Sequence, residues 1–417
     1  MPEGPGSTGE LSRRLGTSDA VVVGLGSMVG AGVFTVFAPA AAAAGPAVLL
    51  SLGLAAVVAF CNATSSARLA VRYPSSGGTY VYGRERLSPF WGYLAGWGFV
   101  VGKTASAAAM ALTVGLYAWP EHAHAVAVAA VVLLTAVNYV GVQRSVQLTK
   151  AVVALVLLVL AGVVAVCLTS GRAPGTAPLT GGGGAGGVLQ AAGLLFFAFA
   201  GYARIATLAE EVRDPARTVR VAVPLALGLT LLVYLAVGAA VLTVLGGGLA
   251  TSGAPLADAV TAAGHGPWVP VVRVAAAVAA LGALLGVILG ISRTTLAMAR
   301  DGHLPSALAA VHPRFGVPHR AELAVGAVVA VVAAVADVRA VIGFSSFAVL
   351  VYYAVTNASA WTLRPDEGRP PRVVPVVGFA GCLALAFSVP AGSLVAGAAV
   401  LAAGALVHAV RRRSRRP

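Results

Sequence analysis

The sequence predicts an all-α polytopic membrane protein with twelve transmembrane helices. Of its 417 residues, 59% are hydrophobic and only 10% are charged, and the mean hydropathy is +0.90. These values lie outside the range of soluble globular domains. Apolar runs of spanning length recur along the chain and begin near residues 19, 46, 90, 124, 148, 188, 220, 268, 320, 340, 373 and 391. The first run is too long for a cleavable signal peptide, so it counts as a span.

The basic residues indicate on which side of the membrane each loop lies. The net charge is +14, with 28 Lys and Arg against 14 Asp and Glu, but these residues follow the loops of a membrane protein. Only Arg172, Arg273 and Arg339 fall in loops on one side, Lys103 and Arg204 fall within spans, and the others fall on the opposite side. By the positive-inside rule both termini are cytoplasmic, and nucleic acid is excluded as a partner.

The patterns of enzymes and metal sites are missing from the sequence. The three cysteines, Cys61, Cys167 and Cys382, lie in apolar runs as small buried residues, so no disulfide, metal or other cofactor is expected. The chain has no His-Glu-x-x-His, no Gly-x-Ser-x-Gly and no paired intramembrane carboxylates. An intramembrane enzyme is therefore disfavoured.

The first span contains a stretch that disfavours a continuous helix. Gly24–Gly32 has four glycines among nine residues, and each costs about 1 kcal/mol in a helix relative to alanine. Irregular backbone at membrane depth is tolerated only where protein covers it or where it lines a cavity. We expect a break that offers backbone groups to a ligand, with a half-helix that restarts after Gly32 and whose amides suit a carboxylate. The alternative is that these glycines only allow close helix packing.

The sixth span has an interruption of its own. Phe196–Arg204 combines adjacent aromatic residues, a glycine and a charge at mid-depth. Because five is an odd number of spans, a second block of five enters the membrane from the opposite side and again begins with a broken span. The sequence therefore predicts two inverted five-helix repeats with a substrate site at the midplane. The expected segments are a cytoplasmic tail (1–18), the first repeat (19–170), an external glycine-rich linker (171–187), the second repeat (188–363), two peripheral transmembrane helices (364–410) and a basic cytoplasmic tail (411–417).

Five stretches, in order along the chain, carry the pattern of a known family. They are Gly26–Phe34 in the first span, Tyr73–Tyr80 after the second, Phe197–Tyr202 with Glu211–Arg217 around the sixth, Ala299–Pro305 at the end of the eighth, and Tyr352, Tyr353 and Asn357 in the tenth. Together they resemble the amino acid/polyamine/organocation (APC) superfamily of permeases. The resemblance covers nearly the whole chain. It implies a LeuT-type five-plus-five inverted repeat with two additional helices, discontinuous spans one and six, and transport by alternating access.

The resemblance also implies where a substrate lies. The α-carboxylate would bind amides of Gly30–Gly32, the α-amino group would meet carbonyls near Met28, Phe197 and Ala200, and an aromatic gate would close the site. The candidate substrate-binding residues are Met28, Gly30, Ala31, Gly32, Lys103, Phe197, Phe199, Ala200, Gly201 and Tyr202, of which Phe199 and Tyr202 would form the gate.

Two positions depart from the family pattern. Many members carry a lysine in the fifth span where sodium-coupled relatives bind sodium, and the corresponding residue here is Val156. Many also carry an acidic residue after the glycine of the sixth span, where this chain has Ala203 followed by Arg204. Sodium coupling is disfavoured because Leu281–Ile291 in the eighth span carries no hydroxyl side chain.

The two charges within spans are candidate coupling or gating residues. Lys103 lies deep in the third span, where a charge costs about 2.5 kcal/mol or more. A direct role in substrate or proton coupling is favoured, and the alternative is a structural ion pair or a bond to carbonyls freed by the broken helices. A cation here would repel a dibasic side chain and favour a neutral or acidic substrate. Arg204 would hold an acidic side chain or pair with Glu210 and Glu211.

These observations predict a secondary active transporter for an amino acid or related amine in a bacterial inner membrane, either proton-coupled or exchanging. Its partners would be the small molecule, the lipid bilayer and protons as the candidate coupling ion. A substrate sensor or a channel of the same fold is the main alternative.

Overall fold

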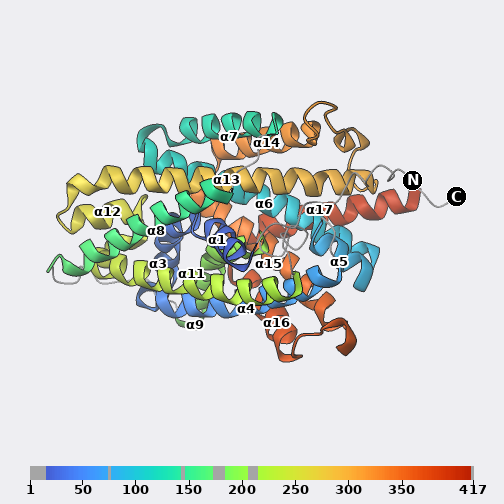
Figure 1. Cartoon of the computed structure of the whole chain (residues 1–417), viewed down its shortest axis with the longest axis horizontal. Coiled ribbons are helices and arrows are strands. Elements are labelled where there is room, and N and C mark those ends of the chain that lie inside the picture. The colour runs from blue at the N-terminus through green and yellow to red at the C-terminus, as the bar shows by residue number, and fades with distance from the viewer. Residues whose placement is uncertain (1–15, 74–76, 142–145, 172–183, 205–214, 415–417) are drawn as a thin grey trace, which may run out of the picture.

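The computed structural model describes residues 16–73, 77–141, 146–171, 184–204 and 215–414, and within these residues it contains helices and no β-strand. Most of the long helices run along the long axis of the molecule (Figure 1). The α-helices are α1 (Thr17–Met28), α2 (Ala31–Thr35), α3 (Phe37–Ala44), α4 (Val48–Arg72), α5 (Thr79–Arg86), α6 (Pro89–Ala118), α7 (Ala123–Tyr139), α8 (Val146–Thr169), α9 (Gly184–Phe199), α11 (Pro215–Leu245), α12 (Pro255–Ala262), α13 (Val269–Arg300), α14 (His319–Val335), α15 (Val338–Trp361), α16 (Val373–Ser388) and α17 (Ala391–Ser414).

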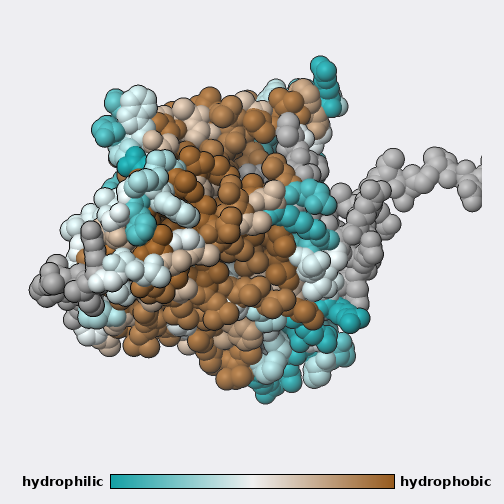
Figure 2. Space-filling model, turned by 60° about the vertical axis from the view of Figure 1, so that its left-hand side comes forward, coloured by the Kyte–Doolittle hydropathy of each residue, from teal (hydrophilic) through white to brown (hydrophobic). Residues whose placement is uncertain are grey.

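The described part of the chain contains ten helical segments that are long and apolar enough to cross a membrane. They are Thr17–Thr35, Phe37–Arg72, Pro89–Ala118, Pro120–Tyr139, Gln147–Thr169, Gly184–Tyr202, Arg217–Thr251, Gly266–Arg300, Val338–Trp361 and Ala391–Arg411. Two further helices lie at expected span positions but are shorter, α14 with 17 residues and α16 with 16. On the face shown in Figure 2, a broad hydrophobic surface separates hydrophilic residues at two ends. The chain is therefore a multi-pass membrane protein.

The helix α6 forms the interior of the bundle. Within the most apolar 18-residue stretch of α6, 78% of the residues are buried. The corresponding share in the last segment, Ala391–Arg411, is 22%. The helix α6 packs mainly against α13 and α15. Small residues make this possible, because a Cβ at Gly96 would lie 2.9 Å from Met298 Sδ of α13, and one at Gly102 would lie 2.8 Å from Ala348 Cβ of α15.

The first span is interrupted at Val29 and Gly30, where α1 ends and α2 begins at Ala31. The break lies inside the predicted stretch, but the expected restart after Gly32 is wrong, because Gly32 is already helical. The glycine at position 26 also stays within α1. It serves packing, since a Cβ there would lie 2.8 Å from Val153 Cγ2 of α8.

The sixth span changes its winding at the expected position. The helix α9 ends at Phe199 and continues as a single 3₁₀ turn, η3 (Ala200–Tyr202). At its other end α9 begins at Gly184, so four residues of the expected linker 171–187 are helical. Close packing on α3 explains this difference, because a Cβ at Gly187 would lie 2.4 Å from the carbonyl oxygen of Ala43. The rest of that linker, apart from Gly171, lies outside the described residues.

Candidate functional site

The two interrupted helices touch at their breaks. A Cβ at Gly201, in η3, would lie only 2.1 Å from the carbonyl oxygen of Ser27 and 2.8 Å from the amide nitrogen of Met28. A Cβ at Gly32 would lie 2.7 Å from Ala198 Cα. The packing interpretation therefore applies to this place, since glycine brings two backbones into direct contact. The ligand interpretation stays a prediction.

A tyrosine of α11 bridges the two breaks. The hydroxyl of Tyr234 lies 2.6 Å from the carbonyl oxygen of Met28 and 3.1 Å from that of Ala198. The side chain is fully buried, and its ring packs on Phe199 with 5.2 Å between centroids. In this conformation a protein hydroxyl thus binds the Met28 carbonyl that was expected to meet an amino group.

Lys103 reaches the second break from α6. Its side chain is 8% exposed, and Nζ donates to the carbonyl oxygen of Ala200 over 3.4 Å. Among the described residues no carboxylate lies within ion-pair distance of Nζ. This geometry corresponds to the alternative in which the ammonium binds a carbonyl of a broken helix. It also places a cation on another of the carbonyls expected to hold a substrate amine.

The remaining candidate side chains are packed around the second break. Phe197, Phe199 and Tyr202 are all buried, and the Tyr202 ring lies 5.1 Å from that of Tyr353 on α15. The Tyr202 hydroxyl has no hydrogen-bond partner within the described ranges. Arg204 follows η3 and is partly exposed. Its expected partners, Glu210 and Glu211, lie outside the described residues.

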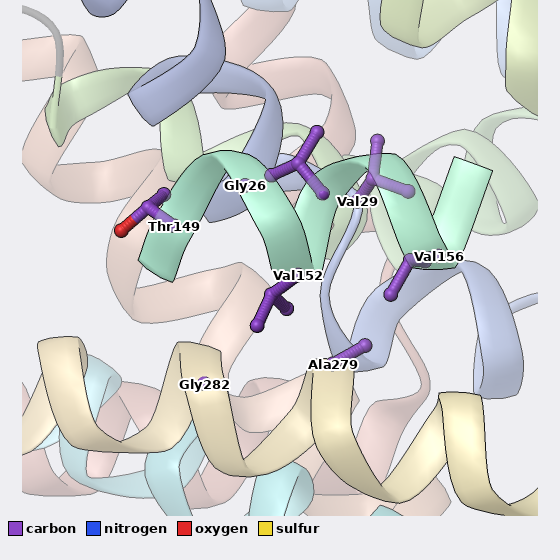
Figure 3. Close-up of a pocket in the computed structure, with 8 residues that line it drawn as sticks. Gly26, Val29, Thr149, Val152, Val156, Ala279 and Gly282 are labelled. Carbon is purple, nitrogen blue, oxygen red and sulfur yellow. The ribbon is translucent and has the colours of Figure 1, made fainter. Parts of the chain in front are cut away.

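A small pocket lies on the other side of the first break, between α1, α8 and α13 (Figure 3). Its volume is about 20 Å³, which is room for about one water molecule. Val29, Val156 and Ala279 line it, and Thr149 supplies the one hydroxyl among the lining side chains. Val156, which stands where many APC members have a lysine, therefore faces the break. These side chains do not form the oxygen-rich set that a sodium ion needs.

The model of the amino acid permease family matches residues 15–407 of this sequence. The chain belongs to the amino acid permease family. It is similar to an uncharacterized transporter of Mycobacterium tuberculosis, with 66% identity over 97% of this chain and 92% of that protein. The methylthioribose transporter of Bacillus subtilis is 26% identical over 95% of this chain and 93% of its own length. Human cationic amino acid transporter 4 is 28% identical over 87% of this chain and 61% of its own length.

These relatives are transporters by name and not enzymes, so a transporter role is supported, and membership of the APC superfamily is confirmed. Amino acid permeases take small-molecule amino acids as substrates. The sequence did not single out Tyr234, which contacts both interrupted helices. A single tyrosine in an apolar helix has no partner that spacing can reveal, because its two carbonyls lie 206 and 36 residues away along the chain.

Ion pairs join the short helix α5 to two segments that are distant in sequence. Arg84 Nη1 lies 2.8 Å from Asp301 Oδ2 at the end of α13, and Tyr80 donates to the same oxygen over 2.5 Å. Arg86 Nη2 lies 2.5 Å from Glu367 Oε1 in the 3₁₀ turn η8 (Pro365–Glu367). The Arg86 guanidinium is the main group that lowers the pKa of Glu367 to about 2. These contacts join α5 to two segments more than 200 residues away in sequence.

Proposed function

We propose that this protein is a secondary active transporter that moves an amino acid or related amine across the cytoplasmic membrane by alternating access. Twelve helices would cross the membrane, the ten apolar segments together with α14 and α16, in a LeuT-type five-plus-five arrangement with two additional helices. Both termini would be cytoplasmic, and the repeats would have the boundaries expected from the sequence. Transport would be proton-coupled or by exchange.

The contact between the two breaks is the observation that supports this proposal most. Irregular backbone deep in a membrane protein is tolerated where it lines a binding site or is covered by protein. Here glycine brings the two irregular segments together at Gly201 and Ser27. Relative movement of these segments would open and close a site between them.

The substrate would bind backbone groups of both breaks. The amides of Ala31 and Gly32 have no acceptor within their own helix, because they are the first of α2, and they would hold the α-carboxylate. The α-amino group would take the carbonyls of Met28 and Ala200, where Tyr234 and Lys103 now bind. A substrate amine would therefore displace the Lys103 ammonium.

The charge of Lys103 also bears on which substrates fit. A second positive charge on the substrate side chain would be repelled by the ammonium in a site of low dielectric constant. We therefore expect a neutral or acidic amino acid and not a dibasic one. Two of the relatives are named for different substrates, cationic amino acids and methylthioribose. Their names therefore do not decide between a neutral, an acidic and a dibasic substrate.

The test is counterflow in proteoliposomes. A thermal-shift screen of the twenty amino acids and common polyamines on purified protein first identifies a ligand. Vesicles loaded with that unlabelled ligand should then accumulate the labelled form at a saturable rate. A substrate sensor binds the ligand without counterflow, and a channel conducts without saturation or trans-stimulation. Either result would refute the carrier function.

A further inference from the structure

A buried carboxyl group lies outside the site described above. Glu322, in the first turn of α14, has no exposed surface, and neither of its carboxyl oxygens has a hydrogen bond of good geometry within the described residues. The nearby hydroxyl of Ser292, on α13, donates its one hydrogen to the carbonyl oxygen of Leu289. α14 packs against α7, α13 and α6, and Figure 1 shows α7 beside α14 along one edge of the bundle with α13 next to them. Glutamate is almost never fully buried without a partner.

The charged group that acts on this carboxyl is Arg293 of α13. Its guanidinium attracts the carboxylate, but no ion pair joins the two in the described part of the chain. The hydroxyl of Thr135, on α7, is also buried without a partner. It lies one helical turn from Glu322, since a Cβ at Gly326 would be 2.5 Å from Thr135 Oγ1.

The other titratable groups on α14 and on the helices packed against it do not pair with Glu322. Arg300 of α13 and Arg320 of α14 are exposed, and Arg273 lies 20 residues before Arg293 on α13. His124 of α7 bonds the carbonyl of Ala333 near the far end of α14, and Lys103 of α6 binds the second break. The two tyrosine hydroxyls of α6 bond backbone carbonyls of other segments. Tyr139 of α7 packs its ring edge-on against His319, one turn before Glu322. The 3₁₀ turn η7 (Ser306–Ala309), which also touches α14, carries no titratable side chain.

We propose that Glu322 is a proton-binding site linked to the conformational change, and this rests on the transporter function proposed above. In the present conformation a carboxylate here would lose its hydration with only the attraction of Arg293, at more than ion-pair distance, to offset the loss, so the carboxyl holds a proton on one of its oxygens. A conformation in which α13 and α14 separate would give the carboxyl water or bring it onto Arg293, and the proton would leave to the cytoplasm. Protonation and conformation are then coupled thermodynamically.

The helix α13 connects this proton site to the substrate site. Its first half packs on the first break, where a Cβ at Gly30 would lie 2.8 Å from Ala283 Cβ. Its second half carries Arg293. A movement of α13 at the break therefore changes the surroundings of Glu322 as well. The bound proton stabilises the conformation in which α13 and α14 are packed against each other.

Two variants and a matched control test the proposal. Glu322→Gln imitates the protonated form, Glu322→Asp keeps a carboxyl, and Glu121→Gln makes the same chemical change at an exposed glutamate of the 3₁₀ turn Pro120–His122. The first measurement is the infrared difference spectrum between each variant and the unchanged protein in detergent. We expect the carbonyl band of one protonated carboxyl to disappear in E322Q and to remain in E121Q. Retention of that band in E322Q would overturn the proposal, whether or not the protein transports.

The second measurement is the counterflow rate as a function of symmetrical pH. The unchanged protein, E121Q and E322D should show a pH-dependent step that E322Q lacks, while E322Q keeps counterflow at the low-pH end. Binding of the identified ligand should change the number of bound protons by up to about one in the unchanged protein and by none in E322Q. An E322Q variant that keeps the pH profile and the proton count refutes the proposal. Absence of counterflow in the unchanged protein at every pH refutes the transporter function instead.

Discussion

Replacement of Gly201 by alanine should separate the two broken helices. The new Cβ would lie 2.1 Å from the carbonyl oxygen of Ser27, whereas real Cβ contacts stay beyond 3.0 Å, so the backbones must move apart by about 0.9 Å. The partner atoms belong to backbone and cannot rotate away. Overpacking of this kind costs about 1–3 kcal/mol. If that cost falls on the closed contact, counterflow should slow between roughly fivefold and 160-fold.

Matched glycine variants separate this effect from a general effect of alanine. Gly228 in α11 and Gly286 in α13 have no heavy atom within 4 Å of a built Cβ. Alanine at either position should be neutral or stabilising by up to about 1 kcal/mol, because alanine favours the helix. The assays are the thermal unfolding midpoint in detergent and the initial rate of counterflow. G201A values that match those of G228A in both assays would refute the packing argument.

Three further variants test single contacts. The unchanged protein should bind a zwitterionic ligand more tightly as the pH rises and the Lys103 ammonium loses its proton, because the ammonium competes for the second break; Lys103→Met should lack this rise, and an unaltered pH response in equilibrium binding contradicts the competition. Tyr234→Phe removes the hydroxyl hydrogen bond to the carbonyl of Met28, which keeps the amide of Gly30 as a donor, and should cost about 0.5–1.5 kcal/mol; an unchanged unfolding midpoint and counterflow rate would count against the bridge. Glu367→Gln removes a stabilising ion pair with Arg86, which is fully present above pH 4.5 and is lost as the pH falls toward 2. The difference in unfolding midpoint between E367Q and the unchanged protein should therefore shrink over that interval, and a difference that is constant with pH contradicts the assignment.

The sequence located both irregular segments because their composition is unusual at membrane depth. Glycine content predicted the first break, and the aromatic residues with a glycine and a charge predicted the second. Composition could not, however, separate a glycine that allows close helix packing from a glycine that lies at the break. Gly26 allows α8 to approach and remains helical, whereas Gly30 lies at the break itself. Only the position of the neighbouring helix distinguishes them.

The partners of the buried polar groups could not be predicted from one sequence. Lys103 was recognisable because a charge inside an apolar span is costly, but the carbonyl that it binds is 97 residues away. Glu322 gave no signal, since a glutamate in the first turn of a helix is ordinary at a membrane surface. Its complete burial results from packing against α7, which is distant in sequence, and against α13, the preceding α-helix, whose orientation one sequence does not give.

The hydroxyl of Tyr234 carries one hydrogen, yet two carbonyls lie within reach of it. It can therefore point toward Met28, whose carbonyl oxygen also accepts from the amide of Gly30, or toward Ala198. An ammonium ion carries three N–H bonds and would reach both carbonyls at once, which a single hydroxyl hydrogen cannot do. A substrate amine would thus tie the two broken helices together more fully than the tyrosine does.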